Sequence, residues 1–360
     1  MTSRPLRSEL HRAPAAAVET RPLSAPEETE WRRFAMSLPE ATLFHSLEWR
    51  DAVSVTYPFR PRYIGAWRGS ELTGILPLFS VKNPFTRQVL ISVPFGVYGG
   101  AVATDRETRE LLAGTAAELA LTEQAAYCEL RHQELLGAEG FAAKDGYATF
   151  VRELPRDPDR CLLELPRKAR AAARQAQERH GLETTTGVDQ LPDFYRLFVH
   201  NKRHLGSPVL PLRFFEALID ELGDRVGILL VRREGEALAG VVTFFHRDVV
   251  MPYYSGSLHE HEGLQINNFM YLRLMEEGVR LGYRRFDFGR SRVDSGSYRF
   301  KKNQGFEPRP LHYEYHLAAA REIPDLTPSN PRFRFAEEIW KHMPSLLVRK
   351  VGPFLIRYFA

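Results

Sequence analysis

Two segments of twelve residues in this chain resemble each other, and this repeat constrains the fold more than any other feature of the sequence. RGSELTGILPLF occupies residues 68–79, and EGEALAGVVTFF occupies residues 234–245. When the two are superposed at one constant spacing, four pairs of residues coincide: Gly69 with Gly235, Leu72 with Leu238, Gly74 with Gly240, and Phe79 with Phe245. The match predicts an internal duplication in which a glycine-bearing turn joins two strands in each copy.

The elements predicted around the repeat follow the same order in both halves. In the first half, apolar patterning predicts a helix at Arg106–Glu123 and strands at Phe59–Arg68, Glu71–Ser80, Gln88–Pro94, Ala126–Arg131 and Tyr147–Leu154. In the second half, it predicts a helix at Gln265–Leu281 and strands at Val226–Arg233, Ala237–His246, Val249–Ser255, Arg285–Phe288 and Pro310–Leu317. This order predicts an α+β fold made of two α/β modules, each with a mixed sheet flanked by helices.

The length of 360 residues fits two modules of ordinary size. A polar stretch with a proline at residues 156–159 indicates the boundary between them. We therefore predict four parts: a disordered arm at 1–25, the first module at 26–155, the second module at 156–320, and a basic amphipathic tail at 321–360.

Composition excludes several classes of protein. No apolar run is long enough for a membrane-spanning helix, and the N-terminal segment has no apolar stretch typical of a secretory signal. The two cysteines, Cys128 and Cys161, form no CxxC motif, so the sequence predicts no metal site and fits a reducing cytoplasm. A net charge of +4 does not indicate binding of double-stranded DNA.

The second half contains GLQINNFMYLRLMEEGVRLGYRRFDFGRS followed by YRFKKNQGFEP. These linked motifs resemble the closing half of the FemAB/FemX family and its relatives with a BioF2-like acetyltransferase domain. The similarity is greatest to the FemAB-like proteins associated with PEP-CTERM/exosortase and exopolysaccharide loci. The resemblance implies tandem GNAT folds, no metal, and no tightly bound cofactor. It also implies transfer of an acyl or aminoacyl group from an activated donor, aminoacyl-tRNA or an acyl thioester, to an amine.

Two departures from known patterns bear on the substrates. GNAT enzymes hold the pyrophosphate of coenzyme A with a glycine-rich loop before a helix, and neither residues 259–265 nor 94–104 supply such a loop. Acetyl-CoA is therefore disfavoured as the donor. FemX-type enzymes also carry a basic residue that holds a substrate phosphate, after the helix that opens here at residues 45–49. Residues 53–57 offer none, which disfavours a UDP-linked muropeptide as the acceptor.

Two adjacent lysines, Lys301 and Lys302, follow a predicted strand and lie between aromatic residues. By the resemblance, Lys301 matches the lysine that stabilises the donor and its developing negative charge. A lysine ammonium suits this task because acyl transfer to an amine passes through a tetrahedral oxyanion. For Lys302, substrate binding and a solvated position on a loop are equally open.

Asp287 ends a predicted buried strand and is a candidate for accepting the amine proton. The alternative is a structural pair with Arg290, which is itself a candidate for substrate binding. Ser291 is rejected as a nucleophile because no His–Asp constellation accompanies it.

A row of arginines lies on the predicted helix that begins near Pro166. Arg167, Arg170 and Arg174 share one face of this helix, which suits contacts with phosphates of a sugar-linked precursor or of tRNA. A solvated face is the equal alternative. By contrast, Lys202 at the end of the next helix is assigned to the helix dipole.

Other residues are placed near the expected cleft by the order of the elements. Asn268 and one of the adjacent tyrosines Tyr253 and Tyr254 are predicted to line it, because neighbouring side chains on a strand point to opposite faces. Tyr98, within the glycine-rich stretch of the first module, is a candidate for holding part of the acceptor.

The tail at 321–360 alternates apolar clusters with basic residues. We expect it to pack against the protein, because Pro344 and Pro353 interrupt a long surface helix. The alternative is contact with an anionic membrane surface, which would place a cytoplasmic protein at the inner face of the membrane.

Together these features predict an N-acyltransferase of FemAB type that acts on a phosphate-bearing or sugar-linked precursor of the cell envelope or an exopolysaccharide. Two alternatives stay open. One is a small-molecule N-acetyltransferase that uses acetyl-CoA. The other is a GNAT-fold scaffold without catalytic activity that binds charged polysaccharide precursors.

Overall fold

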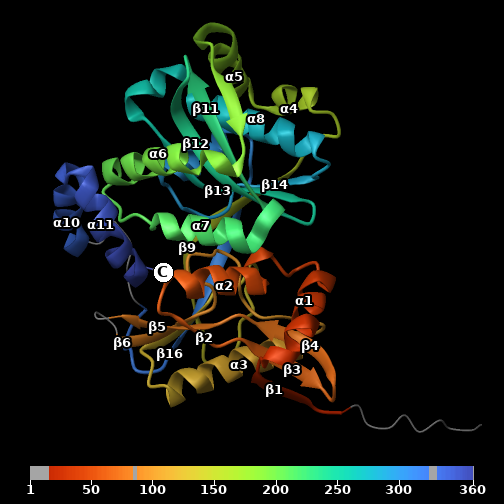
Figure 1. Cartoon of the computed structure of the whole chain (residues 1–360). Helices are drawn as coiled ribbons and strands as arrows, with labels where there is room; N and C mark the ends of the chain where they lie inside the picture. The colour runs from red at the N-terminus through yellow and green to blue at the C-terminus, as the bar shows by residue number, and fades with distance from the viewer. Residues whose placement is uncertain (1–15, 84–86, 324–330, 360) are drawn as a thin grey trace, which may run out of the picture.

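The computed structural model describes residues 16–83, 87–323 and 331–359 and arranges them as two α/β modules stacked on one another (Figure 1). The first module, in red to yellow, contains α1 to α3, and the second, in green to cyan, contains α4 to α8. Strands β9 and β16 run between them. The chain therefore has an α+β fold built from two tandem modules.

The first module contains α1 (Glu28–Ser37), α2 (Leu47–Thr56) and α3 (Arg106–Thr122). Its strands are β1 (Val18–Pro22), β2 (Arg60–Pro61), β3 (Ile64–Arg68), β4 (Glu71–Leu76), β5 (Phe79–Asn83), β6 (Arg87–Ile91), β7 (Val102–Ala103), β8 (Tyr127–Leu130) and β9 (Ala142–Glu153).

The second module contains α4 (Asp159–Glu164), α5 (Arg167–His180), α6 (Leu191–His204), α7 (Leu212–Leu222), α8 (Ile266–Arg280) and α9 (Gly296–Asn303). Its strands are β10 (Glu183–Thr186), β11 (Val226–Arg233), β12 (Glu236–His246), β13 (Val249–Ser257), β14 (Arg285–Asp287), β15 (Ser291–Arg292) and β16 (Pro308–Leu317).

Two further helices, α10 (Pro331–His342) and α11 (Ser345–Ile356), pack beside α6 at the left of Figure 1. Short 3₁₀ turns complete the described chain: η1 (Ala25–Glu27), η2 (Leu43–His45), η3 (Val188–Gln190), η4 (Gly223–Arg225), η5 (His259–Leu264) and η6 (Arg357–Phe359).

The two predicted hairpins are confirmed, but the predicted superposition of their glycines is wrong by one residue. Both segments are hairpins with a turn of two residues. Gly69 is the first residue of its turn, whereas Gly235 is the second and follows Glu234, which also has a positive φ. The short sequence match therefore located both hairpins but did not determine which residues of the two turns correspond.

A strand–helix–strand unit recurs more faithfully than the hairpin. Strand β6 leads through α3 to β8, and β13 leads through α8 to β14. The two strands are parallel in both units, with Leu90 opposite Cys128 in the first and Val249 opposite Arg285 in the second. Helical crossovers of this kind are the usual connection between parallel strands.

The two modules share one sheet. Strand β16 lies between β8 and β9 and is antiparallel to both, while β9 also pairs with β14. The last strand predicted for the second module therefore completes the sheet of the first. The predicted boundary at residue 155 falls between β9 and α4 and does not interrupt this sheet.

The predicted disordered arm is too long at its C-terminal end. Residues 18–22 form β1, which pairs with β3 from Pro22–Ile64 to Val18–Arg68. The arginines and prolines of this segment hid the strand, because its side chains are mostly exposed at the edge of the sheet. Residues 1–15 of the predicted arm lie outside the described residues.

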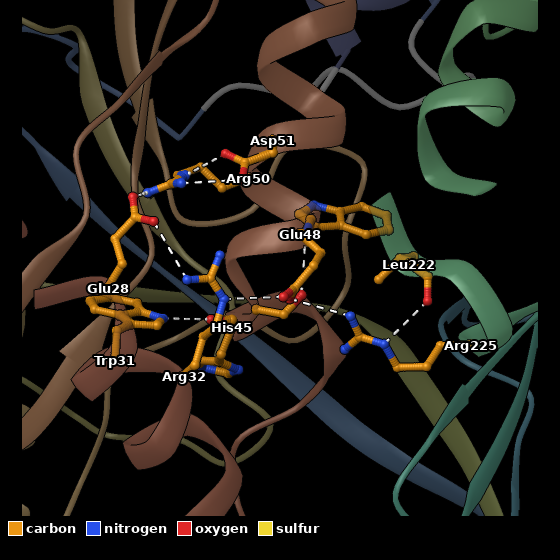
Figure 2. Close-up of polar contacts among 11 residues, drawn as sticks. Glu28, Trp31, Arg32, His45, Glu48, Arg50, Asp51, Leu222 and Arg225 are labelled. Atoms are coloured by element: carbon orange, nitrogen blue, oxygen red, sulfur yellow. Dashed lines mark hydrogen bonds and ion pairs between the residues drawn. The ribbon is translucent and has the colours of Figure 1, made fainter. Parts of the chain in front are cut away.

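Charged and aromatic contacts join the modules between α2 and α7. Glu48 on α2 forms an ion pair of 3.3 Å with Arg225 of the second module, and Arg32 on α1 contacts the same carboxylate (Figure 2). Next to this pair, the buried ring of Trp49 packs edge-on against Phe214 of α7, with 6.1 Å between centroids. These contacts hold the two modules in a fixed relative position on one side of the shared sheet.

Candidate active site

A cavity of about 990 Å³ lies between the two modules. Strands β13 and β14 pair at only two positions, Val249 with Arg285 and Val250 with Phe286, and the cavity reaches the residues that follow these pairs on both strands. The first module contributes residues of β6, β8 and the following loops, while α6, α11 and η6 contribute further wall. A cavity with contributions from both modules can hold a donor and an acceptor together.

Both Tyr253 and Tyr254 line this cavity, which corrects the expectation that only one would. The ladder between β12 and β13 passes from Val242–Tyr254 to Thr243–Pro252, so Tyr253 is an extra residue in a β-bulge. A bulge interrupts the alternation of side chains along a strand. Tyr253 donates a hydrogen bond of 2.8 Å to the carbonyl oxygen of Phe95, whereas the buried hydroxyl of Tyr254 has no hydrogen-bond partner within the described part of the chain.

Lys301 lies in the cavity wall on helix α9, where the sequence predicted a loop after a strand. The helix begins after Ser295, whose hydroxyl caps it by accepting a hydrogen bond from the Tyr298 N–H at 3.2 Å. This cap places Lys301 in the last turn with its side chain directed inward. The lysine is 9% exposed, in contrast to its exposed neighbour Lys302.

The amine of Lys301 donates to three backbone carbonyl oxygens in the segment that follows β14. The acceptors are Phe288 at 2.6 Å, Gly289 at 3.0 Å and Arg290 at 3.3 Å. Burial lowers the pKa of Lys301 to about 7, against the opposing effect of the nearby Asp287 carboxylate. Because an ammonium has three N–H donors, these carbonyls account for all of them. Lys301 therefore holds this segment in place.

Arg290 extends from that segment into the cavity wall. Its guanidinium lies 4.5 Å from the ring centroid of Tyr147 and 5.4 Å from that of Tyr313, and it donates to the Tyr313 hydroxyl at 3.4 Å. Among the residues that the structure describes, no carboxylate forms an ion pair with it. Because arginine stays charged at any ordinary pH, Arg290 supplies a permanent positive charge that can receive an anionic group.

Asp287 is not among the residues that line the cavity. It is 6% exposed, and its Oδ1 accepts hydrogen bonds from the Gly289 N–H at 2.7 Å, the Tyr98 hydroxyl at 3.2 Å and the Thr149 hydroxyl at 3.4 Å. Burial raises the pKa of this carboxyl. The predicted pairing with Arg290 is absent. These contacts join β14 to the first module and are not arranged for removing a proton from a substrate.

Tyr98 and Asn268 also lie outside the cavity wall, contrary to their predicted placement. Tyr98 is 2% exposed, and its hydroxyl is committed to Asp287 and Thr149. Asn268 donates to Gln265 at 3.0 Å and accepts from Gln304 at 2.6 Å, which ties the start of α8 to the end of α9. The order of the elements placed both residues close to the site. Their polar atoms, however, hydrogen-bond to other residues of the protein and do not face the cavity.

The arginine row and Lys302 lie on the outer surface of the second module. Arg167 and Arg174 are exposed on α5, which packs against α8, and Arg170 donates to the Leu163 carbonyl at 3.2 Å. The ammonium of Lys302 lies 5.9 Å from the ring centroid of Tyr298. None of the four lines the cavity, so phosphate binding by the arginines and substrate binding by Lys302 stay predictions.

Several cavity residues were not selected from the sequence. Arg131 follows β8 as Arg290 follows β14, and it forms a buried ion pair of 2.7 Å with Glu129. The equivalence of the two strand–helix–strand units points to Arg131, but the local match between their sequences is too short to select it. Lys202 also lines the cavity, where burial lowers its pKa, although the sequence assigned it to a helix dipole. Ser291, 5% exposed, has a hydroxyl without a hydrogen-bond partner in the wall.

Basic side chains outnumber acidic ones around the cavity. Among the residues that the structure describes, its wall contains two acidic residues, Glu129 and Glu337, and six basic residues: Arg131, Lys144, Lys202, Arg290, Lys301 and Arg357. Such an excess raises the local concentration of anionic ligands and favours their entry. No cluster of three or more His, Cys, Asp or Glu side chains suited to a metal ion occurs in the described part of the chain.

Comparisons with known proteins agree with this architecture. A family model described as an acetyltransferase (GNAT) domain matches residues 165–302. The crystal structure of FemX superposes with a TM-score of 0.64 at 16% identity, covering 89% of this chain and all of the other. A search of curated proteins finds no match.

Two further solved structures share the arrangement. A tandem GNAT protein from the clavulanic acid biosynthesis pathway superposes with a TM-score of 0.53 at 13% identity, covering 86% of this chain and 100% of the other. L-PGS from Bacillus licheniformis gives 0.52 at 14% identity, with coverages of 82% and 93%. The fold is thus a tandem GNAT fold, and together with the domain match it supports an acyltransferase.

Proposed function

We propose that this protein transfers an aminoacyl or acyl group from an activated donor to an amine of an anionic precursor of the cell envelope or an exopolysaccharide. The donor would be an aminoacyl ester of tRNA or an acyl thioester. The observation that carries the proposal is Arg290, a cation in the wall of a cavity between two GNAT modules that forms no ion pair with any described carboxylate. The GNAT domain match at 165–302 supports the reaction class.

The reaction forms a C–N bond and breaks a C–O or C–S bond. The amine nitrogen attacks the donor carbonyl carbon, and negative charge develops on the carbonyl oxygen in the tetrahedral intermediate. A charged donor fixed in advance stabilises this oxyanion without reorganising at the moment of reaction. The amine loses its proton as the leaving oxygen or sulfur gains one, so the products are an amide and a free alcohol or thiol.

Arg290 is assigned to the developing oxyanion, and Lys301 is assigned to positioning Arg290. The three carbonyl contacts of Lys301 fix the backbone that carries the guanidinium. Tyr254 and Ser291 lie in the same wall, and their buried hydroxyls have no hydrogen-bond partner among the described residues. The surplus of basic residues supports an acceptor with phosphate or carboxylate groups.

An assay with labelled donors tests this function. Total tRNA charged with radiolabelled amino acids, or labelled acetyl-CoA, is incubated with the protein and a precursor fraction from the source cells. We expect label to enter an alkali-stable amide product. Arg290→Met should lower the rate about a hundredfold, as removal of one oxyanion donor does in other enzymes.

Lys302→Met provides the matched control, because it removes a neighbouring positive charge from the exposed side of α9. It should leave the rate unchanged. If neither donor yields a labelled product, the scaffold alternative is supported. If Arg290→Met retains the full rate, Arg290 does not act on the oxyanion.

A further inference from the structure

Helix α11 exposes apolar side chains on the side that faces away from the protein. The exposed fractions are 71% for Leu346, 47% for Leu347, 38% for Val351 and 54% for Phe354. A turn of 3.6 residues brings these four positions onto one face of the helix. We call this set the α11 apolar face.

The opposite face of α11 is also apolar and attaches the helix to the second module. Val348 is fully buried, and a Cβ on Gly352 would lie 2.6 Å from a methyl carbon of Val209. This close approach fixes which side of the helix faces outward. A surface helix of a globular protein normally pairs one apolar face with a polar one, so an outer apolar face indicates a further contact.

Positive charge accompanies the α11 apolar face. Lys350 is exposed and lies within it by helical position, while Arg349 at its edge is 5.5 Å from the Tyr195 ring centroid. The helix sequence, SLLVRKVGPFLI, contains no acidic residue. Apolar side chains with interspersed lysine and no acid complement an anionic bilayer surface. There the lysine stem lies among acyl chains and the ammonium reaches the headgroups.

A second copy of this chain is a poorer occupant of the same face. In a twofold dimer the face would meet itself, so Lys350 would approach Lys350 of the other copy without a compensating carboxylate on the helix. Stable interfaces also bury roughly 800 Å² on each partner, more than one short helix face provides.

We propose that the α11 apolar face docks this protein on an anionic membrane surface. The same helix continues into the cavity wall through Leu355 and Ile356, followed by η6. Docking through α11 would therefore bring the cavity between the modules close to lipid headgroups.

Vesicle co-sedimentation tests the docking without requiring any reaction, so its failure would leave the proposed transfer untouched. The full-length protein is mixed with phosphatidylcholine vesicles that either contain or lack phosphatidylglycerol. We expect binding to the anionic vesicles that weakens as salt is raised. Leu347→Glu should lower the partition coefficient at least tenfold, and Lys350→Glu should lower it about fivefold for each unit of positive charge lost.

Leu121→Glu is the matched control, because Leu121 is 56% exposed on α3 in the other module. It should bind the vesicles as the unmodified protein does. The proposal is overturned if the unmodified protein ignores anionic vesicles, or if Leu347→Glu binds them equally well. It is also overturned if light scattering shows that Leu347→Glu instead converts a dimer to a monomer. Should Leu347→Glu fail to fold, Lys350→Glu decides alone.

Discussion

The ammonium of Lys301 donates a hydrogen bond to the backbone carbonyl of Arg290, 3.3 Å away. With the carbonyls of Phe288 and Gly289, this contact uses the three donors that a lysine ammonium has. By resemblance to a known family, Lys301 was expected to stabilise developing negative charge. In this structure its ammonium instead donates to backbone carbonyls. The guanidinium of Arg290, held by the same segment, lines the cavity and forms no ion pair with a described carboxylate.

Lys301→Met should lower kcat about a hundredfold and change KM less, because it releases the segment that positions Arg290. It should also lower the free energy of unfolding by about 1–3 kcal/mol, since buried carbonyls lose their donor. Steady-state kinetics and urea unfolding measure the two effects. Lys302→Met should change neither.

The pH profile separates positioning from a purely structural role of Lys301. Its pKa is lowered to about 7 by burial, so the ammonium that contacts three carbonyls loses one donor as pH rises through that value. The rate supported by Lys301 should therefore decline above about pH 7, and Lys301→Met should lack this inflection. If both proteins have the same pH profile, Lys301 does not act through its charge.

The sequence identified the elements that depend on local patterns. Two hairpins, the helices α3 and α8, and the parallel strands on either side of each helix all follow from apolar spacing and turn residues. It did not identify the position of β16 between β8 and β9, because strand pairing over a long separation leaves no local pattern. The shared sheet was missed for this reason.

The site was predictable to the level of which segments approach one another. Arg290, Lys301 and one of the two adjacent tyrosines line the cavity as expected, whereas the second tyrosine was not expected there. The alternation of side chains along a strand applies only to a regular strand. It therefore could not predict the bulge that brings Tyr253 to the cavity together with Tyr254. The prediction for Asp287 was wrong because the sequence around a carboxylate at the end of a strand looks the same in two cases. The side chain can face a substrate, or it can accept hydrogen bonds inside the protein, as Asp287 does.

Acetyl-CoA should bind weakly to this protein. The segment between β13 and α8 is the 3₁₀ turn η5, followed by Gln265 in a left-handed conformation, without the glycine-rich loop that directs backbone N–H groups at a pyrophosphate. Calorimetric titration measures the affinity. Tight and saturable binding would instead support the acetyl-CoA-dependent alternative.

Arg170→Ala should raise KM for the phosphate-bearing substrate and reduce its dependence on salt, if the arginine row binds phosphates. Initial rates at several salt concentrations give both quantities. Arg179→Ala is the control, because it removes an exposed arginine from the same helix but outside the row. Unchanged kinetics in Arg170→Ala would assign the row to the solvated surface.

Lowering the pH from about 6.5 toward 4 should destabilise the folded protein. In this range His45 gains a proton in the unfolded chain, whereas the folded protein keeps it neutral. His45 is 2% exposed, and burial lowers its pKa to about 4. Its Nδ1 accepts from the Thr42 N–H at 3.0 Å, and its Nε2 lies 2.9 Å from the Gly100 carbonyl, so the neutral ring is the form that fits.

Because the folded pKa lies below the ordinary value of about 6.5, this residue's contribution is complete above pH 6.5 and is lost as pH falls toward 4. The slope is about 1.4 kcal/mol per pH unit for one such histidine. Urea unfolding at pH 7, 6 and 5 should show the decline, and His45→Gln should make it shallower. His342→Gln, a change at an exposed histidine, should leave it as it was. An equal slope in His45→Gln and the unmodified protein would show that another group causes the acid sensitivity.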